Sequence, residues 1–321
     1  MKQKWIALIL MFFMITGCSQ MNHNSSSKDG SHNGKNETNI EDMEKGFKQV
    51  PFHGVKDKQG RLNILIVGVD SRGEKRSRSD AIMIAQYDPK SKKAKLVSIM
   101  RDSYVKIPNY SKEYNKINTS YYLGGADLLR QTIKENFGID VEHFLAIDFK
   151  GFVKVVDMIA PEGIEVDMKK EIIADMGLNV EPGRQRLHGK ELLAYARFRH
   201  DAESDFGRVK RQQEVLTALK DTFTNELSTL EGMFKLPGVG QELMNYIDTD
   251  MDFQTLIAIG GSVLLNPIAQ IETMRIPLNA SYEDIRYDHA GAVLELDFEK
   301  NKQALKEFLI NEPKPVNELN K

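Results

Sequence analysis

Arginines gather in residues 195–213, where basic and acidic side chains alternate in a chain whose formal net charge is only −2. If this segment is extended, Arg197 and Arg199 point the same way, because side chains alternate along a strand, and the two could bind one anion. A guanidinium group binds phosphate oxygens in a bidentate way that lysine cannot match. The alternative is a solvated surface run whose charges pair with one another. The charged residues concerned are Arg197, Arg199, Asp201, Glu203, Asp205, Arg208 and Arg211.

The second half of this segment opens a long helical pattern, predicted over residues 207–230. Its first turns carry Arg208, Arg211 and Gln212, and the N-terminus of a helix favours an anion through its dipole and its free N–H groups. Arg208 and Gln212 are four residues apart and share a helix face. Arg211 lies about 60° from Arg208 around the helix axis. It is therefore the arginine that we least expect at a shared anion site.

Acidic residues stand where predicted strands begin or end. The apolar run over residues 63–70 is typical of a strand buried on both faces, and it places Asp70 at one edge of a sheet. Asp80 precedes the next strand. Two carboxylates that face one point repel each other unless a cation lies between them, and Mg²⁺ suits carboxylates combined with substrate phosphates. Asp70 and Asp80 are thus candidate metal ligands, although surface aspartates that cap turns would give the same pattern.

Five motifs occur together in an order that resembles one known family. They are N-I-L-I-V-G-V-D-S-R, R-S-D, L-V-S-I-M-R-D-S-Y-V-K-I-P, K-I-N, and A-Y-A-R-F-R-H-D followed by D-F-G-R-V-K-R-Q-Q. Over residues 62–219 the chain resembles the LytR-CpsA-Psr family. This resemblance implies a bacterial cell-envelope enzyme that transfers a glycopolymer, such as teichoic acid or capsule, from a polyprenyl pyrophosphate carrier to peptidoglycan.

The resemblance also implies roles for single residues. Asp70 and Asp80 match the family's Mg²⁺ ligands, with Mn²⁺ as an alternative metal. The positions that match its pyrophosphate-binding residues are Arg101, Lys116, Arg197, Arg199, Arg208 and Gln212. The candidate catalytic residues are Arg101, Asp102 and Asp205, of which the two aspartates would act as a base or orient the arginines. Two departures do not involve these residues: Met100 stands where the family usually has proline, and residues 160–163 replace its paired glycines.

Strand-like and helical segments alternate along the chain, which is typical of an α/β protein. We expect a single domain with a central mixed β-sheet flanked by helices, over residues 51–315, and a short C-terminal tail over residues 316–321. Strands are predicted over residues 63–70, 81–87, 94–99, 104–107, 143–149, 164–166, 268–276 and 293–298. Helices are predicted over residues 126–137, 152–159, 207–230 and 253–265 and through residues 305–309.

The N-terminus has the pattern of an export signal with a lipid attachment site. Lys2 and Lys4 precede an apolar run over residues 5–15, which is shorter than the ~20 residues that span a bilayer and fits a secretory signal. Residues 15–18 resemble a bacterial lipobox that ends at Cys18, the only cysteine of the chain. We therefore expect a signal peptide over residues 1–17, acylation of Cys18 and a disordered tether over residues 18–50. The alternative is an uncleaved signal anchor.

The amino-acid composition and the predicted export signal together limit the classes of partner that we expect. The 321 residues carry no basic excess, so binding of nucleic acid through bulk charge is not expected, and a single cysteine excludes an internal disulfide. The expected partners are a polyprenyl pyrophosphate-linked glycopolymer, peptidoglycan and, through the lipid anchor, the extracytoplasmic face of the bacterial cell membrane.

Two questions stay open from the sequence alone. Several apolar residues could line a pocket for the lipid tail, as the resemblance implies, or could be ordinary core: Phe152, Val156, Leu216, Leu219 and Phe223. The protein could also be a non-catalytic envelope protein that binds anionic polymer or polyprenyl phosphates and modulates wall metabolism. A role in transcription, which the first name of the family suggests, conflicts with the export signal.

Overall fold

The structure is a computed structural model, and it describes residues 51–70, 77–227, 230–266, 268 and 270–310. The predicted signal peptide, the acylation site Cys18 and the tether lie outside the described residues, as does the C-terminal tail. Within the described ranges, no helix combines the length and the apolar character needed to cross a membrane.

A six-stranded sheet forms the centre of the fold, with the strand order β10-β3-β2-β1-β6-β9. β1 runs parallel to β6 and β10 runs parallel to β3, whereas the other neighbours are antiparallel, so the central sheet is mixed, as predicted. The strands are β1 (Leu62–Val69), β2 (Ser79–Asp88), β3 (Lys93–Ile99), β6 (His143–Asp148), β9 (Asp248–Thr249) and β10 (Ile271–Ile276).

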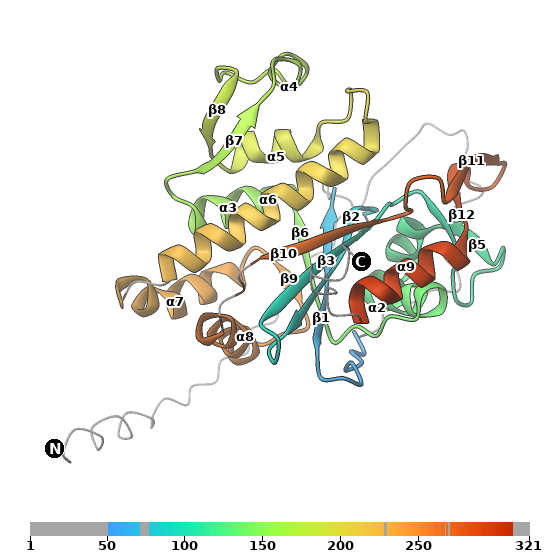
Figure 1. Cartoon of the computed structure of the whole chain (residues 1–321), viewed down its shortest axis with the longest axis horizontal. Coiled ribbons are helices and arrows are strands. Elements are labelled where there is room, and N and C mark those ends of the chain that lie inside the picture. Colours follow the sequence, from blue (N-terminus) through green and yellow to red (C-terminus); the bar gives the residue numbers. More distant parts are fainter. Residues whose placement is uncertain (1–50, 71–76, 228–229, 267, 269, 311–321) are drawn as a thin grey trace, which may run out of the picture. The chain divides into compact units, whose positions relative to one another are not determined.

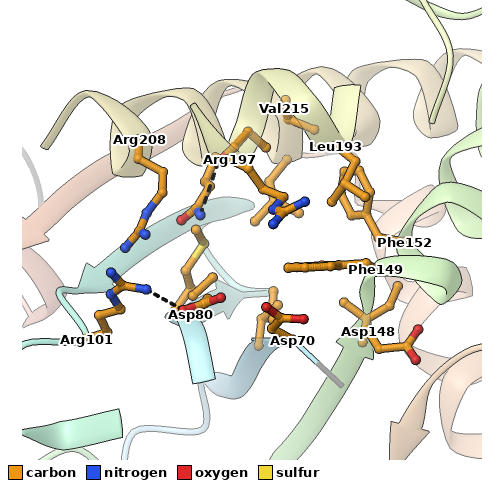
Figure 2. A pocket seen from close by; sticks show the side chains of 18 of the residues that line it. Asp70, Asp80, Arg101, Asp148, Phe149, Phe152, Leu193, Arg197, Arg208 and Val215 are labelled. Atoms are coloured by element: carbon orange, nitrogen blue, oxygen red, sulfur yellow. Dashed lines mark hydrogen bonds and ion pairs between the residues drawn. The ribbon is translucent and has the colours of Figure 1, made fainter. Parts of the chain in front are cut away.

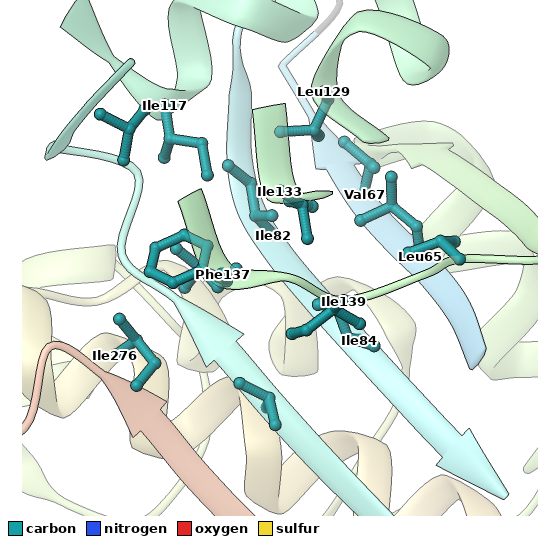
Figure 3. Close-up of a cluster of buried hydrophobic side chains, with 14 of the residues drawn as sticks. Leu65, Val67, Ile82, Ile84, Ile117, Leu129, Ile133, Phe137, Ile139 and Ile276 are labelled. Carbon is teal, nitrogen blue, oxygen red and sulfur yellow. The ribbon is translucent and has the colours of Figure 1, made fainter. Parts of the chain in front are cut away.

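One face of the central sheet packs against two helices, α2 (Ile117–Phe137) and α9 (Phe298–Ile310) (Figure 1). Side chains alternate along β1, and every second one, including Leu65 and Val67, points into this layer. There they meet Ile133 and other apolar residues of α2 (Figure 3). This core accounts for the apolar residues on one of the two faces of β1.

The other face of the sheet is covered by three helices, α3 (Phe149–Ile159), α5 (Gly189–Arg197) and α6 (Ser204–Leu227) (Figure 1). Gly189 allows α5 to approach α3 closely, because a Cβ at this position would lie 2.4 Å from the carbonyl oxygen of Val153. Helix α6 is fixed to the sheet by Gln213, whose amide donates to Ser98 Oγ on β3 and to the Met274 carbonyl on β10, both at 2.9 Å.

Two smaller sheets accompany the central one. A four-stranded sheet has the order β11-β12-β4-β5, and a two-stranded antiparallel sheet joins β7 and β8. These strands are β4 (Ser103–Lys106), β5 (Tyr114–Lys116), β7 (Ile164–Met168), β8 (Gly183–Leu187), β11 (Tyr282–Tyr287) and β12 (Gly291–Leu296). The remaining helices are α4 (Lys170–Met176), α7 (Leu230–Leu243) and α8 (Phe253–Leu265).

Some elements differ from the prediction. The helix predicted over residues 207–230 begins at Ser204 and ends at Leu227. α2 includes an unpredicted first part, because the chain is helical from Ile117, leaves helical geometry at Gly124 and Gly125, and then resumes the predicted helix. The sequence also missed α5, which carries Arg197 as its last residue. This last difference changes how the arginines are presented.

Candidate active site

A cavity of about 270 Å³ lies between the central sheet and helices α3, α5 and α6 (Figure 2). Ile66 and Gly68 of β1 and Met83 of β2 line it on the side of the sheet. They belong to the face of β1 and β2 that does not point into the α2 core, which explains why β1 is apolar on both faces. Asp70 continues the same alternation just beyond β1 and also lines the cavity.

A β-bulge brings Asp80 to the same cavity. β1 and β2 pair regularly as far as Gly68, where the register shifts and leaves Asp80 as an extra residue of β2. Without this shift Asp80 would alternate onto the face of Ile82, which is buried in the core. The bulge instead turns the carboxylate to the side of Asp70 (Figure 2).

Arg101 follows β3 and lies among three carboxylates. Its Nη1 is 2.5 Å from Asp80 Oδ1, and its Nε is 3.5 Å from Asp102 Oδ2 and 3.8 Å from Asp205 Oδ2. Burial lowers the pKa of the Arg101 guanidinium, but the charges of Asp205, Asp80 and Asp102 outweigh it and raise this pKa above its usual value. Arg101 is therefore a fixed cation in the cavity wall.

Arg208 approaches Arg101 from the first turns of α6 (Figure 2). Its Nη2 donates to Asp205 Oδ2 at 2.8 Å, and its side chain is only 7% exposed. Burial and the neighbouring charge of Arg101 lower the pKa of Arg208. Its buried Nε has no hydrogen-bond partner among the described residues. Two close guanidinium groups with spare donor capacity would be stabilised by a multiply charged anion.

Arg197 and Arg199 also line the cavity, but they do not lie together on an extended segment. Arg197 ends α5, and Arg199 lies two residues beyond that helix. The segment is helical because Leu192 and Tyr195 recur at helical spacing and are buried in the core of α3, α5 and α6. The Arg197 guanidinium lies over the Phe149 ring, with Cζ 4.2 Å from the ring centroid.

Lys116 and Gln212 reach the site in different ways. Lys116 ends β5 and is not among the residues that line the cavity, but its Nζ is 2.8 Å from Asp102 Oδ1 and so joins the charge network of Arg101. Gln212 lines the cavity directly. Its Nε2 donates to the Ala196 carbonyl at 3.4 Å, a contact that ties α6 to the end of α5.

Arg211 does not line this cavity, in agreement with its predicted position around the helix. Its Nη1 donates to Asp201 Oδ2 at 2.7 Å and its Nη2 donates to the Phe198 carbonyl at 2.6 Å. The guanidinium also lies over the Phe198 ring, 5.0 Å from its centroid. These contacts give Arg211 a structural role in holding the segment between α5 and α6.

The character of the cavity changes along its length from cationic to apolar (Figure 2). Arg101 and Arg208 lie at one end, and aromatic and aliphatic side chains lie at the other. The apolar residues come from all three covering helices and are Phe149, Phe152, Leu193, Val215 and Leu216. The cavity could therefore hold a ligand with an anionic head and an apolar tail.

The residues predicted for a tail pocket divide between cavity and core. Phe152 and Leu216 line the cavity. Val156 is fully buried and Leu219 is 8% exposed, and both belong to the core of the covering helices. Phe223 is not among the lining residues. Helical periodicity identified apolar faces here but could not tell which residues on a face meet a cavity.

The model of the LytR_cpsA_psr family matches residues 15–307. The chain belongs to this family. Regulatory protein MsrR of Staphylococcus aureus is 40% identical over 265 residues, which are 83% of this chain and 79% of MsrR. TagU of Bacillus mycoides, named a polyisoprenyl-teichoic acid–peptidoglycan teichoic acid transferase, is 35% identical over 49% of this chain and 51% of its own.

A solved structure of the family carries a lipid. The family protein YwtF (TagT) with bound octaprenyl pyrophosphate superposes on this chain with a TM-score of 0.56 and 25% identity. The match covers 78% of this chain and 90% of that one. The fold described above is therefore the fold of the LytR-CpsA-Psr family.

Asp70 and Asp80 both line the cavity and are candidate ligands for a metal ion. In the described part of the chain, no group of three or more His, Cys, Asp or Glu side chains is arranged for a metal. Mg²⁺ usually takes one or two carboxylates and completes its shell with water and substrate phosphates. The pair thus fits an ion that binds together with a diphosphate, and such an ion would share Asp80 with Arg101.

Sequence reasoning missed Asp148, Phe149 and Leu193 of the cavity. A usable signal existed for Asp148, because β6 runs parallel to β1 and ends in a carboxylate at the level of Val69. The Asp148 side chain accepts a hydrogen bond of 2.7 Å from the Gly151 N–H and caps α3. Phe149 and Leu193 carried no such signal, because an apolar side chain in a helix is usually core.

Proposed function

We propose that this chain is an extracytoplasmic, Mg²⁺-dependent phosphotransferase that moves a glycopolymer of teichoic acid or capsule type from a polyprenyl pyrophosphate carrier to peptidoglycan. The observation that carries the proposal is the division of one cavity into an arginine-rich end and an apolar end. A lipid pyrophosphate has the same division. The octaprenyl pyrophosphate bound to YwtF (TagT) and the transferase name of TagU support this ligand and this reaction class.

The arginines would hold the diphosphate and neutralise its charge. Arg101 is mostly buried at 20% exposed and Arg208 is buried at 7%, and both contact Asp205, so the diphosphate oxygens would meet two guanidinium groups that are already held in place. Arg197 and Arg199, both exposed, would complete the binding from the end of α5. Phe152 and Leu216 would contact the first isoprene units of the tail.

The reaction would be an in-line displacement at the phosphorus that bears the glycan. An acceptor hydroxyl oxygen forms the new bond to phosphorus, the bond from that phosphorus to the bridging oxygen breaks, and polyprenyl phosphate leaves. Asp102 or Asp205 would take the hydroxyl proton or hold Arg101 in place, since both lie within 4 Å of its Nε. Mg²⁺ held by Asp70 and Asp80 would neutralise charge on the diphosphate.

An anchor at Cys18 would keep this site at the membrane that contains the carrier. Two acyl chains suffice for stable attachment of a protein to a bilayer. The chain would then act at the extracytoplasmic face, where peptidoglycan is accessible.

The second candidate function is a non-catalytic envelope protein, and the name of MsrR, a regulatory protein, favours it. Such a protein needs the arginines but not the pair Asp70 and Asp80. The test supplies labelled lipid-linked glycopolymer and peptidoglycan fragments to the wild type and to Asp80→Ala, with and without EDTA. The transferase proposal expects Mg²⁺-dependent transfer by the wild type only. No transfer by a wild type that binds the lipid favours the binding protein, whereas equal transfer by Asp80→Ala would contradict the role of the Asp70 and Asp80 pair.

A further inference from the structure

Four aromatic rings form a platform on the four-stranded sheet, which we call the aromatic platform. Its members are Tyr104 of β4, Tyr114 of β5, Tyr287 of β11 and His289 beyond β11. The rings of Tyr104 and Tyr287 stack with centroids 4.7 Å apart, and Tyr114 and His289 lie 5.6 and 6.1 Å from Tyr104. Tyr114 is 38% exposed and the other three are partly exposed, so this cluster is not core.

Hydrogen bonds fix the orientation of the platform. His289 Nε2 lies 3.1 Å from the carbonyl oxygen of Tyr114, to which it can donate, and 3.3 Å from the hydroxyl of Tyr104. The Tyr287 hydroxyl donates to Glu295 Oε2 at 3.0 Å. Rings held in this way lose little conformational entropy when a ligand stacks on them. The platform is therefore preorganised for a flat, partly apolar ligand.

The platform is continuous with the candidate active site. Tyr104 lies two residues after Asp102, and Tyr114 lies two residues before Lys116. Because side chains alternate along strands, Tyr114 shares a sheet face with Lys116. Tyr104 also pairs in register with Lys116, whose Nζ is 2.8 Å from Asp102 Oδ1. A chain that lies across the platform would reach the site at Asp102.

The charges around the platform argue against an anionic occupant. Glu295 pairs in register with Tyr104, and Glu283 pairs with Glu295, so two carboxylates share the face of the rings. The nearby cations are already paired, Lys106 with Glu135 and Lys116 with Asp102. An anionic bilayer or a teichoic acid chain would be repelled by these two carboxylates. Sugar hydroxyl and amide groups, by contrast, can donate to them.

We propose that the aromatic platform binds the glycan strand of the acceptor and positions one of its sugars beside Asp102. The apolar faces of hexopyranose rings would pack on the tyrosine rings, while Glu295 accepts hydrogen bonds from sugar hydroxyl groups and the tyrosine hydroxyls bond to the ring edges. The choice of peptidoglycan glycan as this occupant rests on the proposed function.

The test measures binding without any donor lipid. Soluble glycan strands from peptidoglycan stripped of teichoic acid are titrated calorimetrically into the wild type and into the double variant Tyr114→Ala/Tyr287→Ala. We expect the double variant to bind at least about tenfold more weakly, which corresponds to ~1.4 kcal/mol. The conservative double variant Tyr114→Phe/Tyr287→Phe keeps both rings and should retain most of the affinity. Phe253→Ala removes an aromatic side chain that is 36% exposed on α8 and should bind as the wild type does.

Transfer kinetics supply a second readout. With donor present, the alanine double variant should show a higher KM for the acceptor strands and an unchanged kcat, because the reacting groups are intact. Thermal unfolding of all three variants shows whether each is folded. A variant that fails to fold is replaced by Tyr114→Ala alone, the most exposed member of the platform.

Several results would overturn the proposal that the aromatic platform binds the glycan strand. One is a wild type that does not bind the strands in the absence of donor, whatever the transfer assay shows. Another is unchanged affinity in the alanine variants. A third is that the alanine variants lose binding to anionic phospholipid vesicles or to free teichoic acid but not to the glycan strands. Absence of transfer by a wild type that does bind the strands would instead count against the proposed function alone.

Discussion

Single side chains divide clearly between site and scaffold, and the two buried arginines of α6 show this best. Arg208 and Arg211 are three residues apart, both are 7% exposed, and each pairs with one aspartate. Yet only Arg208 lines the cavity, whereas Arg211 closes the turn between α5 and α6 through Asp201 and the Phe198 carbonyl. The same charge therefore has two different uses one helical turn apart.

Replacing these arginines should separate ligand binding from stability. We expect Arg208→Gln to weaken binding of a polyprenyl pyrophosphate at least tenfold with little change in unfolding, because Asp205 keeps Arg101 within 4 Å and the repulsion between the two arginines is removed. Arg211→Gln should leave lipid binding unchanged and lower the free energy of unfolding by about 2 kcal/mol, because it leaves Asp201 and a carbonyl without their charged partner. Lipid titrations and urea unfolding of both variants check this. Equal loss of lipid affinity in the two variants would contradict the assignment of Arg208 to ligand binding and of Arg211 to stability.

Asp80, whose carboxylate the β-bulge turns toward the cavity, offers a second comparison. Asp80→Asn should reduce the rate of transfer by about 10²-fold or more, in the range seen when a group that stabilises the reacting charge is lost. Asp88→Asn, at the other end of β2, should transfer at the wild-type rate because Asp88 does not line the cavity. Initial rates at saturating donor measure the difference, and a full rate for Asp80→Asn would remove this residue from the mechanism.

Whole elements depend on a few close approaches. Gly189→Ala should lower the free energy of unfolding by about 1–3 kcal/mol, because the new Cβ would overlap the Val153 carbonyl and push α5 away from α3. Gly260→Ala, on α8, has no atom within 4 Å of the new Cβ and should be neutral or slightly stabilising. Denaturant unfolding of the two variants tests the packing, and a neutral Gly189→Ala would show that α5 can shift freely.

The elements also show where prediction from the sequence ended. Continuous apolar runs predicted β1, β2 and β3 and so placed Asp70, Asp80 and Arg101 at strand ends. The bulge that turns Asp80 toward the cavity depends on pairing between strands, which the sequence of one strand does not reveal. The extended segment considered for Arg197 and Arg199 is replaced at Arg197 by the end of α5, because Leu192 and Tyr195 recur at helical spacing and are buried. Tertiary packing decided both cases.

Across the whole molecule, Asp127 links the segment before β1 to α2. Its carboxylate, 1% exposed, accepts hydrogen bonds from the His53 N–H, Arg130 and Gln131. Burial alone would raise the pKa of Asp127, but these partners lower it below its usual value. A lowered pKa in the folded state contributes stability above the unfolded value of about 3.9, and this contribution is lost as the pH falls through the folded value.

Asp127→Asn should therefore be less stable than the wild type at pH 7 and should lose less stability on acidification below about pH 4. Urea unfolding at neutral and acidic pH gives both quantities. A parallel loss of stability in wild type and variant over the acid range would show that Asp127 does not carry this pH dependence.

The proposed phosphotransfer requires that one cavity holds the diphosphate while the bond at the glycan-bearing phosphorus is exchanged. The most direct measurement counts products from the wild type with Mg²⁺, lipid-linked glycopolymer and peptidoglycan strands. We expect polyprenyl monophosphate and peptidoglycan-attached polymer in equal amounts, with neither formed by Asp80→Ala. Recovery of the lipid as diphosphate, or attachment without release of polyprenyl monophosphate, would contradict the proposed phosphotransfer.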